Sequence, residues 1–201
     1  MPMKLAVCVS GRGSNLTALL EALRGSPLAQ VALVLSNRAD APALARAREW
    51  GIAAEPLTSF RDGQEWLTRL RAHQVDLIVL AGYLKLVPAE VIRAFRGRIV
   101  NIHPALLPAF GGPGMYGHHV HEAVIRAGVP ESGATVHLVD EEYDRGAILA
   151  QARVPVLPGD TPEALAARVL EAEHRLLPQV VLRAAQVGRP VPLADTLSSP
   201  A

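Results

Sequence analysis

Asn101 and His103 are the residues whose types and spacing point most directly to chemistry. They lie two apart in the segment Asn101-Ile102-His103-Pro104, at the end of an apolar run that predicts a strand, and residues two apart on a strand share one face. A carboxamide beside an imidazole can stabilise the oxyanion of a tetrahedral intermediate and transfer protons. A histidine held by hydrogen bonds in a loop is an equally good interpretation of the pattern.

A run of acidic residues, Asp140–Asp144, follows later in the chain. Most such runs are solvated turns, and the functional alternative is a carboxylate that orients and charges a histidine, as in hydrolytic triads. We expect Asp144 to do this for His103, because Gly146 follows closely and permits a tight turn that aims the side chain inward. A carboxylate within about 4–6 Å should raise the pKa of the imidazole.

The segment Gly11-Arg12-Gly13-Ser14-Asn15 lies between an expected strand and an expected helix. Glycines let the backbone bend closely around an anion, and the free amides of a helix N-terminus bind it. Leu16 stands where a dinucleotide-binding motif has glycine, and the lysine of a P-loop is missing from this segment. The spacing therefore favours a phosphomonoester over NAD or ATP, and a plain, well-capped turn is the alternative.

Three histidines, His118, His119 and His121, lie at the start of a later expected helix. Imidazole is the commonest zinc ligand, but side chains two or three residues apart rarely converge on one ion without a distant ligand. Substrate contacts and a solvated loop are the alternatives, and we expect no metal. Cys8 is the only cysteine and lies within an expected strand, so we expect it to be a core residue rather than a nucleophile.

The elements that would position these residues alternate along the chain. Short runs rich in Val, Ile and Leu predict strands at Lys4–Ser10, Val31–Ser36, Leu77–Ala81, Ile99–Ile102, Gly133–Val139 and Ile148–Val156. Helical periods predict helices at Asn15–Gly25, Pro42–Gly51, Asp62–His73, Pro88–Gly97, His119–Ala127 and Pro162–Val187. This alternation implies an α/β fold with a doubly wound, mainly parallel sheet, whose strands present ligand sites at their C-terminal ends. The last two strands are joined too closely for a parallel crossover, so they should be antiparallel.

Individual residues should define where elements end. Asn15 and Asp62 resemble helix N-caps, and Pro178 should bend or stop the last helix. We expect a single domain over residues 1–188 and a loose C-terminal tail over residues 189–201.

The composition excludes several classes of protein. Of the 201 residues, 50% are apolar and 19% are charged, so the chain can bury a large core. The net charge of +1 does not indicate a nucleic-acid or membrane-surface partner. One cysteine suits a reducing cytosol, and we identify neither a membrane-spanning run nor a signal peptide. We expect a cytoplasmic protein that acts on small molecules, as a monomer or homodimer.

Taken together, several stretches resemble the folate-dependent phosphoribosylglycinamide formyltransferase family. They are SGRGSNL (10–16), LSNRADAPALARAREWGI (35–52), DLIVLAGYLKLV (76–87), GRIVNIHPALLPAF (97–110), GATVHLVDEEYDRGAILAQARVPV (133–156) and ARVLEAEHRLLP (167–178). They cover most of the chain in order. The resemblance implies a Rossmann-like formyltransferase fold.

The resemblance also implies roles for individual residues. It implies that the catalytic residues are Asn101, His103 and Asp144. It implies that phosphoribosylglycinamide binds to Gly11, Arg12, Gly13, Ser14, Asn15 and Glu173. It implies that 10-formyltetrahydrofolate, a co-substrate, binds to Leu84, Lys85, Leu86, Val87, Asn101, Asp140 and Glu141, with no metal. An arginine that the family uses near the folate tail aligns with Gly63, and Arg61 is close by. The loop at residues 111–117 is longer than in the family's usual form, and is either a flap over the substrate or a passive insertion.

The implied reaction is transfer of the formyl group from 10-formyltetrahydrofolate to the primary amine of 5′-phosphoribosylglycinamide, in de novo purine biosynthesis. A formyltetrahydrofolate hydrolase without its regulatory domain is the alternative. A binding module for phosphorylated metabolites is a third hypothesis, but it gives no reason for Asn101, His103 and Asp144 to occur together.

Overall fold

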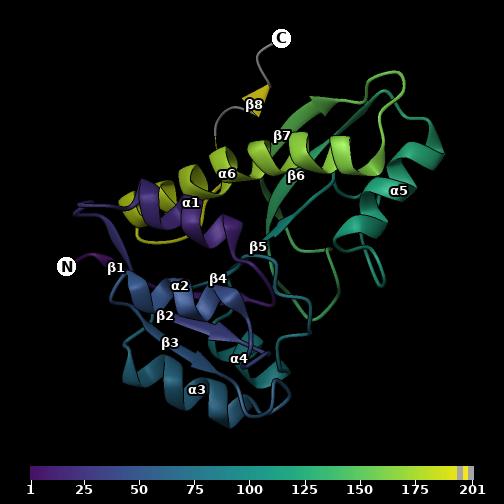
Figure 1. The fold of residues 1–201 in the computed structure, drawn as a ribbon. Coiled ribbons are helices and arrows are strands. Elements are labelled where there is room, and N and C mark those ends of the chain that lie inside the picture. The colour runs from purple at the N-terminus through teal and green to yellow at the C-terminus, as the bar shows by residue number, and fades with distance from the viewer. Residues whose placement is uncertain (194–196, 199–201) are drawn as a thin grey trace.

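The computed structural model describes residues 1–193 and 197–198. Within these residues, one sheet has the strand order β3-β2-β1-β4-β5-β6-β7-β8 (Figure 1). The strands are β1 (Met3–Val9), β2 (Ala29–Ser36), β3 (Ala53–Pro56), β4 (Leu77–Leu80), β5 (Ile99–His103), β6 (Glu131–Leu138), β7 (Ile148–Pro155) and β8 (Leu197–Ser198). The helices are α1 (Ser14–Ala22), α2 (Pro42–Glu49), α3 (Gly63–Ala72), α4 (Ala89–Ala94), α5 (His118–Ala127) and α6 (Pro162–Val187).

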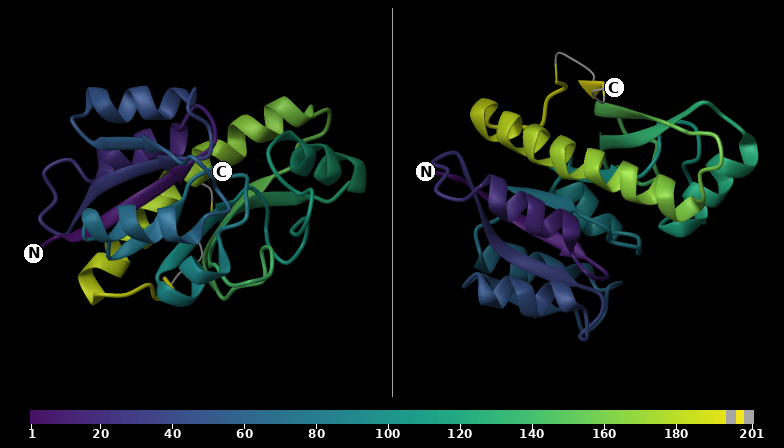
Figure 2. Two further views of the ribbon diagram at one scale, coloured as in Figure 1. Left: turned by 90° about the horizontal axis from the view of Figure 1, so that it is seen from below. Right: turned by 45° about the horizontal axis from the view of Figure 1, so that its top comes forward.

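The pairing of the strands confirms the predicted α/β fold. Neighbours among β1 to β5 are parallel, whereas β6 is antiparallel to both β5 and β7. Helices cover both faces of the sheet, with α1 and α6 on one side and α3 and α4 on the other (Figures 1 and 2). The predicted doubly wound, mainly parallel sheet is therefore confirmed, and so is the predicted antiparallel pairing of β6 with β7; the antiparallel pairing of β5 with β6 adds to it.

The strands are apolar on both faces because each face packs against helices. In β1, Leu5, Val7 and Val9 belong to the core shared with α1, α2, α5 and α6. Ala6 and Cys8 point the other way, into the core shared with α3 and α4. All five side chains are fully buried, so Cys8 is a core residue as predicted, and burial raises the pKa of its thiol.

The helix N-termini agree with the sequence only in part. Asp62 caps α3 as predicted: its Oδ1 accepts the backbone N–H groups of Gln64 at 2.9 Å and Glu65 at 3.1 Å. The prediction that Asn15 caps α1 is wrong. The N-cap is Gly13, whose φ of 75° lies in the left-handed region that glycine adopts without strain, and Asn15 falls in the first turn of the helix.

The last helix and the edge of the sheet also differ from expectation. Helix α6 covers the predicted range and runs through Pro178, so of the two predicted effects of this proline, a bend or a stop, the stop does not occur. Leu177 and Val181 on either side of it are fully buried, and this packing outweighs the hydrogen bond that the proline removes. Strand β3 was not predicted, because it is a short edge strand of four residues that ends at Pro56.

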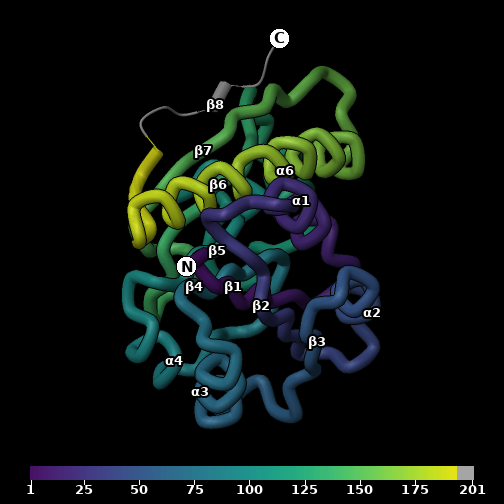
Figure 3. Tube along the Cα trace, turned by 90° about the vertical axis from the view of Figure 1, so that its left-hand side faces the viewer, coloured from purple at the N-terminus to yellow at the C-terminus, as the bar shows by residue number. Residues whose placement is uncertain are grey.

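The described part of the C-terminal segment lies against the sheet. The backbone N–H of Leu193 donates to the carbonyl of Leu149 at 2.9 Å, and β8 pairs in parallel with β7. The trace in Figure 3 shows α6, which precedes this segment, lying beside α1. Residues 194–196 and 199–201, which belong to the predicted tail, lie outside the described residues. In the described ranges, none of the helices has the length and apolar character of a membrane span.

The arrangement of β1, β4 and β5 explains where a site can form. These three strands are neighbours and parallel, so their C-terminal ends lie at the same edge of the sheet. The chain continues from β1 to β2 on one side, whereas β4 lies on the other side of β1, which makes this position a topological switch point. Ligands of open parallel sheets bind at such points, just beyond the strand ends.

Candidate active site

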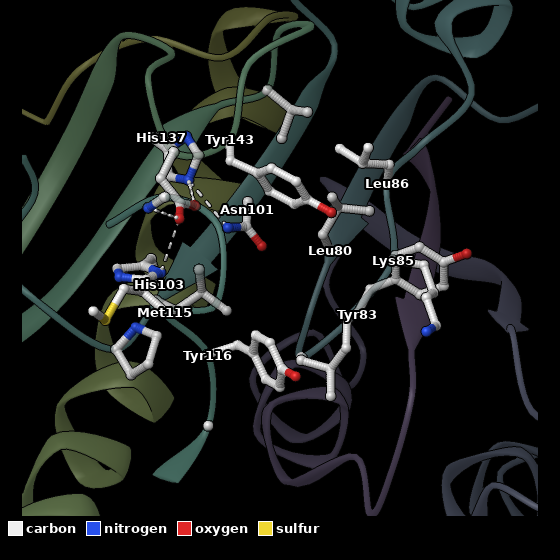
Figure 4. A pocket seen from close by; sticks show the side chains of 18 of the residues that line it. Leu80, Tyr83, Lys85, Leu86, Asn101, His103, Met115, Tyr116, His137 and Tyr143 are labelled. Carbon is white, nitrogen blue, oxygen red and sulfur yellow. Dashed lines mark hydrogen bonds and ion pairs between the residues drawn. The ribbon is translucent and has the colours of Figure 1, made fainter. Parts of the chain in front are cut away.

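A pocket of about 550 Å³ opens at this edge of the sheet (Figure 4). Its volume is typical of sites for small molecules. Segments from all parts of the chain meet around it, and most of the residues predicted from the sequence line it. They are Arg12, Ser14, Leu84, Lys85, Leu86, Val87, Asn101, His103, Asp140, Asp144 and Glu173.

The remaining predicted residues lie beside the pocket. A Cβ atom on Gly13 would come within 2.6 Å of the Cβ of Ala43, so this glycine lets α1 and α2 approach closely. Asn15 is buried, and its Nδ2 donates to Oε2 of Glu173 at 2.5 Å. Glu141 lines a neighbouring hollow instead of the main pocket. Gly11 also lies outside the set of residues that line the pocket.

Asp144 lies between two buried histidines. Its Oδ2 is 3.6 Å from Nδ1 of His103 and accepts the backbone N–H of Gly112 at 2.9 Å. Its Oδ1 is 3.5 Å from Nε2 of His137. The backbone turns inward here as predicted, with Asp144 in the left-handed region at φ 55° and Gly146 packed so closely that a Cβ would lie 1.7 Å from a carbonyl oxygen.

His137 is the side chain of this cluster that the sequence analysis missed. Its Nδ1 lies 2.7 Å from the carbonyl oxygen of Leu138, to which it donates, so Nε2 accepts the Nδ2–H of Asn101 at 3.0 Å. In the ladder between β5 and β6, Asn101 faces His137, and His103 faces Thr135. Thr135 and His137 are polar residues two apart in an apolar strand, which is the signal already used for Asn101 and His103.

Burial sets the protonation state of His103. The side chain is 3% exposed, and its Nε2 donates to the carbonyl oxygen of Phe110 at 2.8 Å. Burial lowers the pKa of His103 by more than the Asp144 carboxylate and the Phe110 carbonyl raise it, so the pKa lies below its ordinary value. The prediction of a raised pKa is therefore wrong, although the carboxylate acts in the predicted direction.

The opposite balance keeps Asp144 ionised. Burial acts to raise the pKa of Asp144, but the neighbouring His137 and His103 and the backbone N–H of Gly112 together lower it by more than burial raises it. The resting site thus combines a carboxylate with an imidazole that is mainly neutral near pH 7. A second negative charge near this pair would raise the pKa of His103 and so favour its protonated form.

One wall of the pocket is an apolar slot beyond β4. Leu84 and Leu86 are 47% and 50% exposed. Neighbouring apolar side chains that are exposed in this way often mark a binding surface. The backbone N–H of Leu84 donates to Oγ of Ser10 at 2.9 Å, which ties the slot to the end of β1. Figure 4 shows Tyr143 and Tyr116 beside the same space. Neither tyrosine was among the predicted site residues.

Two cations flank one aromatic ring near the slot. The guanidinium carbon of Arg61 lies 5.3 Å from the ring centroid of Phe60, and Nζ of Lys85 lies 5.4 Å from the same centroid. At Gly63, where the family resemblance places an arginine, a Cβ would come within 2.8 Å of Oε2 of Glu90. Gly63 itself carries no charge and has no room for a larger side chain, so Arg61 is the residue that can provide a positive contact here.

The predicted phosphate end of the pocket lies across from the slot. Ser14 begins α1, and within the described residues no side chain caps the backbone N–H groups of its first turn. Glu173 on α6 lines this end, and burial raises its pKa to about 7 against the opposing hydrogen bond from Asn15. Near neutral pH, Glu173 can therefore donate as well as accept a hydrogen bond.

The three clustered histidines separate in the structure. Nε2 of His118 lies 3.2 Å from Oε1 of Glu122, and Nδ1 of His119 lies 3.6 Å from Oε2 of the same carboxylate. His121 is buried and lines the pocket together with His118. Across the described ranges, no group of three or more His, Cys, Asp or Glu side chains is arranged to hold a metal ion.

An amide, an imidazole with its carboxylate, and an apolar slot at one edge of a parallel sheet suit the transfer of a small acyl group. The chain belongs to the formyl transferase family, whose sequence model matches residues 3–181. Its relatives include phosphoribosylglycinamide formyltransferases, which confirms the family resemblance identified from the sequence.

Three of these proteins show the extent of the similarity. The chloroplastic phosphoribosylglycinamide formyltransferase of Vigna unguiculata is 50% identical over 185 residues, which are 89% of this chain and 59% of that protein. The Haemophilus influenzae enzyme is 40% identical, over 89% of this chain and 85% of that protein. The crystal structure of the Anaplasma phagocytophilum enzyme has a TM-score of 0.88 at 36% identity and covers 98% of this chain and 97% of its own. The chain thus spans less than two thirds of the plant relative's length.

Proposed function

We propose that this chain transfers the formyl group of 10-formyltetrahydrofolate to the primary amine of 5′-phosphoribosylglycinamide, a step of de novo purine biosynthesis. The observation that carries the proposal is the convergence of Asn101, His103 and Asp144 on one pocket between a helix N-terminus and an apolar slot. The similarity to phosphoribosylglycinamide formyltransferases supports it.

The ribonucleotide occupies the end of the pocket beside α1. Its phosphate binds the backbone N–H groups of the first turn, the hydroxyl of Ser14 and the guanidinium of Arg12. Glu173 binds the ribose, and Asn15 contributes by holding Glu173 through their hydrogen bond. Gly11 and Gly13 shape the loop around the phosphate.

The folate occupies the apolar slot. Leu84, Leu86 and Val87 provide one wall for the flat pteridine, and the loop that carries Asp140 and Glu141 forms the other side. The negatively charged tail of the folate lies toward Lys85 and Arg61, the two cations beside Phe60.

Catalysis depends on charge that appears only in the transition state. The amine of the ribonucleotide attacks the formyl carbon, a C–N bond forms and the carbonyl oxygen becomes an oxyanion. Asn101 has a second N–H for this oxygen, because only one of its two amide hydrogens is donated to His137. The bond from the formyl carbon to the folate nitrogen then breaks, and the proton lost by the amine passes to that nitrogen.

His103 changes its partners during this sequence. At rest its Nε2 donates to the Phe110 carbonyl, and a hydrogen bond to a charged oxyanion is stronger than one to a neutral carbonyl. The oxyanion adds its negative charge to that of Asp144, so the imidazole takes up the proton that the amine releases as the intermediate forms. It returns this proton to the folate nitrogen when the bond to the formyl carbon breaks. The mechanism requires no covalent bond between the enzyme and the formyl group.

Residues 1–188 form one catalytic domain in this proposal, because a single core joins β1 and α1 near the start of the chain to α6 near its end. The buried, lone thiol of Cys8 suits a reducing compartment such as the cytoplasm.

One spectroscopic experiment tests the proposed function. Purified protein is mixed with 10-formyltetrahydrofolate, and the folate absorbance is followed with and without glycinamide ribonucleotide. Turnover that requires the ribonucleotide supports the transferase, whereas equal turnover without it identifies a hydrolase. His103→Ala should abolish most of the activity, and His73→Ala, at the C-cap of α3 and outside the pocket, is the matched histidine control. A protein that consumes no folate in either mixture contradicts both activities.

A further inference from the structure

His121 is a buried polar side chain that the proposed mechanism leaves unused. It lies on α5, is 5% exposed and lines the pocket. Its Nδ1 has no hydrogen-bond partner within the residues that the structure describes. His118 and His119 on the same helix both face the carboxylate of Glu122.

A buried polar atom without a partner destabilises a folded protein, and such atoms are rare for that reason. Leucine at position 121 would remove this cost, because the neighbouring core is apolar: Val120 and Val124 of the same helix are fully buried. Stability of the folded protein therefore does not explain a histidine at this wall, whereas a bound ligand that hydrogen-bonds its free nitrogen does.

The surroundings of His121 define the chemistry of that ligand. Polar side chains that line the same pocket include Ser14, Arg12, His118 and Glu173. Burial lowers the pKa of His121 to about 4, with smaller contributions in the same direction from His118 and His103. The imidazole therefore stays neutral near pH 7, with one donor and one acceptor nitrogen.

A neutral imidazole matches a hydroxyl group, which also both donates and accepts. A phosphate offers only acceptors and is better served by cations such as Arg12. The attacking amine needs a base whose pKa lies near the working pH, and His121 titrates too low for that role. A sugar hydroxyl is the group that remains.

We propose that His121 on α5 is a substrate-binding residue that hydrogen-bonds a hydroxyl group of the acceptor's ribose, the same sugar that Glu173 on α6 binds. The inference rests on the proposed function, since that function places a ribose at this end of the pocket. It assigns α5 a direct part in acceptor recognition, in addition to covering the sheet.

The test compares three variants by calorimetry and thermal unfolding, with glycinamide ribonucleotide and 10-formyltetrahydrofolate titrated separately. His121→Leu should weaken ribonucleotide binding at least tenfold, leave folate binding within twofold and leave the melting temperature equal or higher. His121→Gln keeps a donor and an acceptor and should recover most of the ribonucleotide affinity. His119→Leu, an exposed neighbour outside the pocket, is the control and should change neither affinity.

Ribonucleotide analogues that lack the 2′- or the 3′-hydroxyl identify the contact. One of them should bind the wild type at least tenfold more weakly than the full ribonucleotide, yet bind His121→Leu as well as the full ribonucleotide does. Unchanged ribonucleotide affinity in His121→Leu overturns the proposal, as does a lowered melting temperature with both ligands weakened alike. If the wild type binds no ribonucleotide, the proposed function itself fails, whereas tight wild-type binding with an indifferent His121→Leu refutes the role of His121 alone.

Discussion

Replacing Asp144 with Asn removes the negative charge between His103 and His137 while keeping the size of the side chain. The carboxylate lies 3.6 Å from Nδ1 of His103. Two unit charges at this distance attract each other by roughly 4–5 kcal/mol at an effective dielectric constant of about 20. The asparagine amide oxygen can retain part of this interaction as a dipole. We therefore expect a loss of at least about 2.7 kcal/mol in the transition state, which is about a 100-fold fall in turnover.

The same substitution should change the pKa of His103 in a defined direction. Asp144 raises that pKa and burial lowers it, so Asp144→Asn leaves the lowering effect of burial with less opposition. The pKa of His103 in Asp144→Asn should therefore lie below that of the wild type. Titration of the imidazole C–H signals by NMR measures it directly, and an equal or higher pKa would show that the carboxylate does not charge the ring.

The kinetic assay uses saturating concentrations of both substrates near pH 7, and calorimetry checks that Asp144→Asn still binds each of them. Asp40→Asn, an exposed partner of Arg38 outside the set of residues that line the pocket, is the matched control and should keep full turnover. The double variant with His103→Ala should be little slower than the slower single variant, because residues that act as a unit are not additive. If the two losses multiply instead, Asp144 and His103 act independently and the proposed pair is refuted.

Three further predictions follow from the geometry. Leu84→Asp should weaken 10-formyltetrahydrofolate binding at least tenfold in calorimetry with little change in melting temperature, because Leu84 is 47% exposed; an equal loss of ribonucleotide affinity would contradict its place in the slot. Gly146→Ala should reduce turnover at least as much as Asp144→Asn, because its Cβ would lie 1.7 Å from the carbonyl oxygen of Leu138, and wild-type activity would show that the turn can move freely. His121 has a pKa of about 4 in the folded protein and roughly 6.5 in the unfolded chain, so below pH 6.5 the unfolded chain binds more protons. This difference should lower the free energy of unfolding by roughly 2 kcal/mol at pH 5. Glu173, with a pKa of about 7, acts in the opposite direction, so the measurement is a comparison of urea unfolding of the wild type and of His121→Leu at pH 7 and pH 5. Identical pH dependences of the two proteins would refute the lowered pKa of His121.

Local patterns in the sequence were sufficient for much of the fold. Apolar runs identified most of the strands, because a strand buried between two layers of helices must be apolar on both faces. Asp62 could be recognised as a cap because its carboxylate needs only the next three residues to make its hydrogen bonds. Asn101 and His103 could be paired because a period of two places them on one face of β5 without reference to any other element.

Other features depended on neighbours that no local pattern reveals. His137 joined the site through the register between β5 and β6, which sets Asn101 opposite it across a separation of many residues. Asn15 resembles a helix cap in the sequence, but its side-chain amide donates a hydrogen bond to Glu173 on α6, near the other end of the chain. Strand β3 became a strand only because β2 offered a free edge for it to pair with.

The protonation of His103 shows most clearly what tertiary structure alone decided. The sequence indicated a carboxylate partner, and that partner is in place and acts in the expected direction. The sequence could not indicate how completely the imidazole is removed from water, because burial is produced jointly by β5, β6 and the loops that close over them. Desolvation lowers the pKa of His103 by more than Asp144 raises it, so the imidazole is mainly neutral at rest and becomes protonated only when the oxyanion forms.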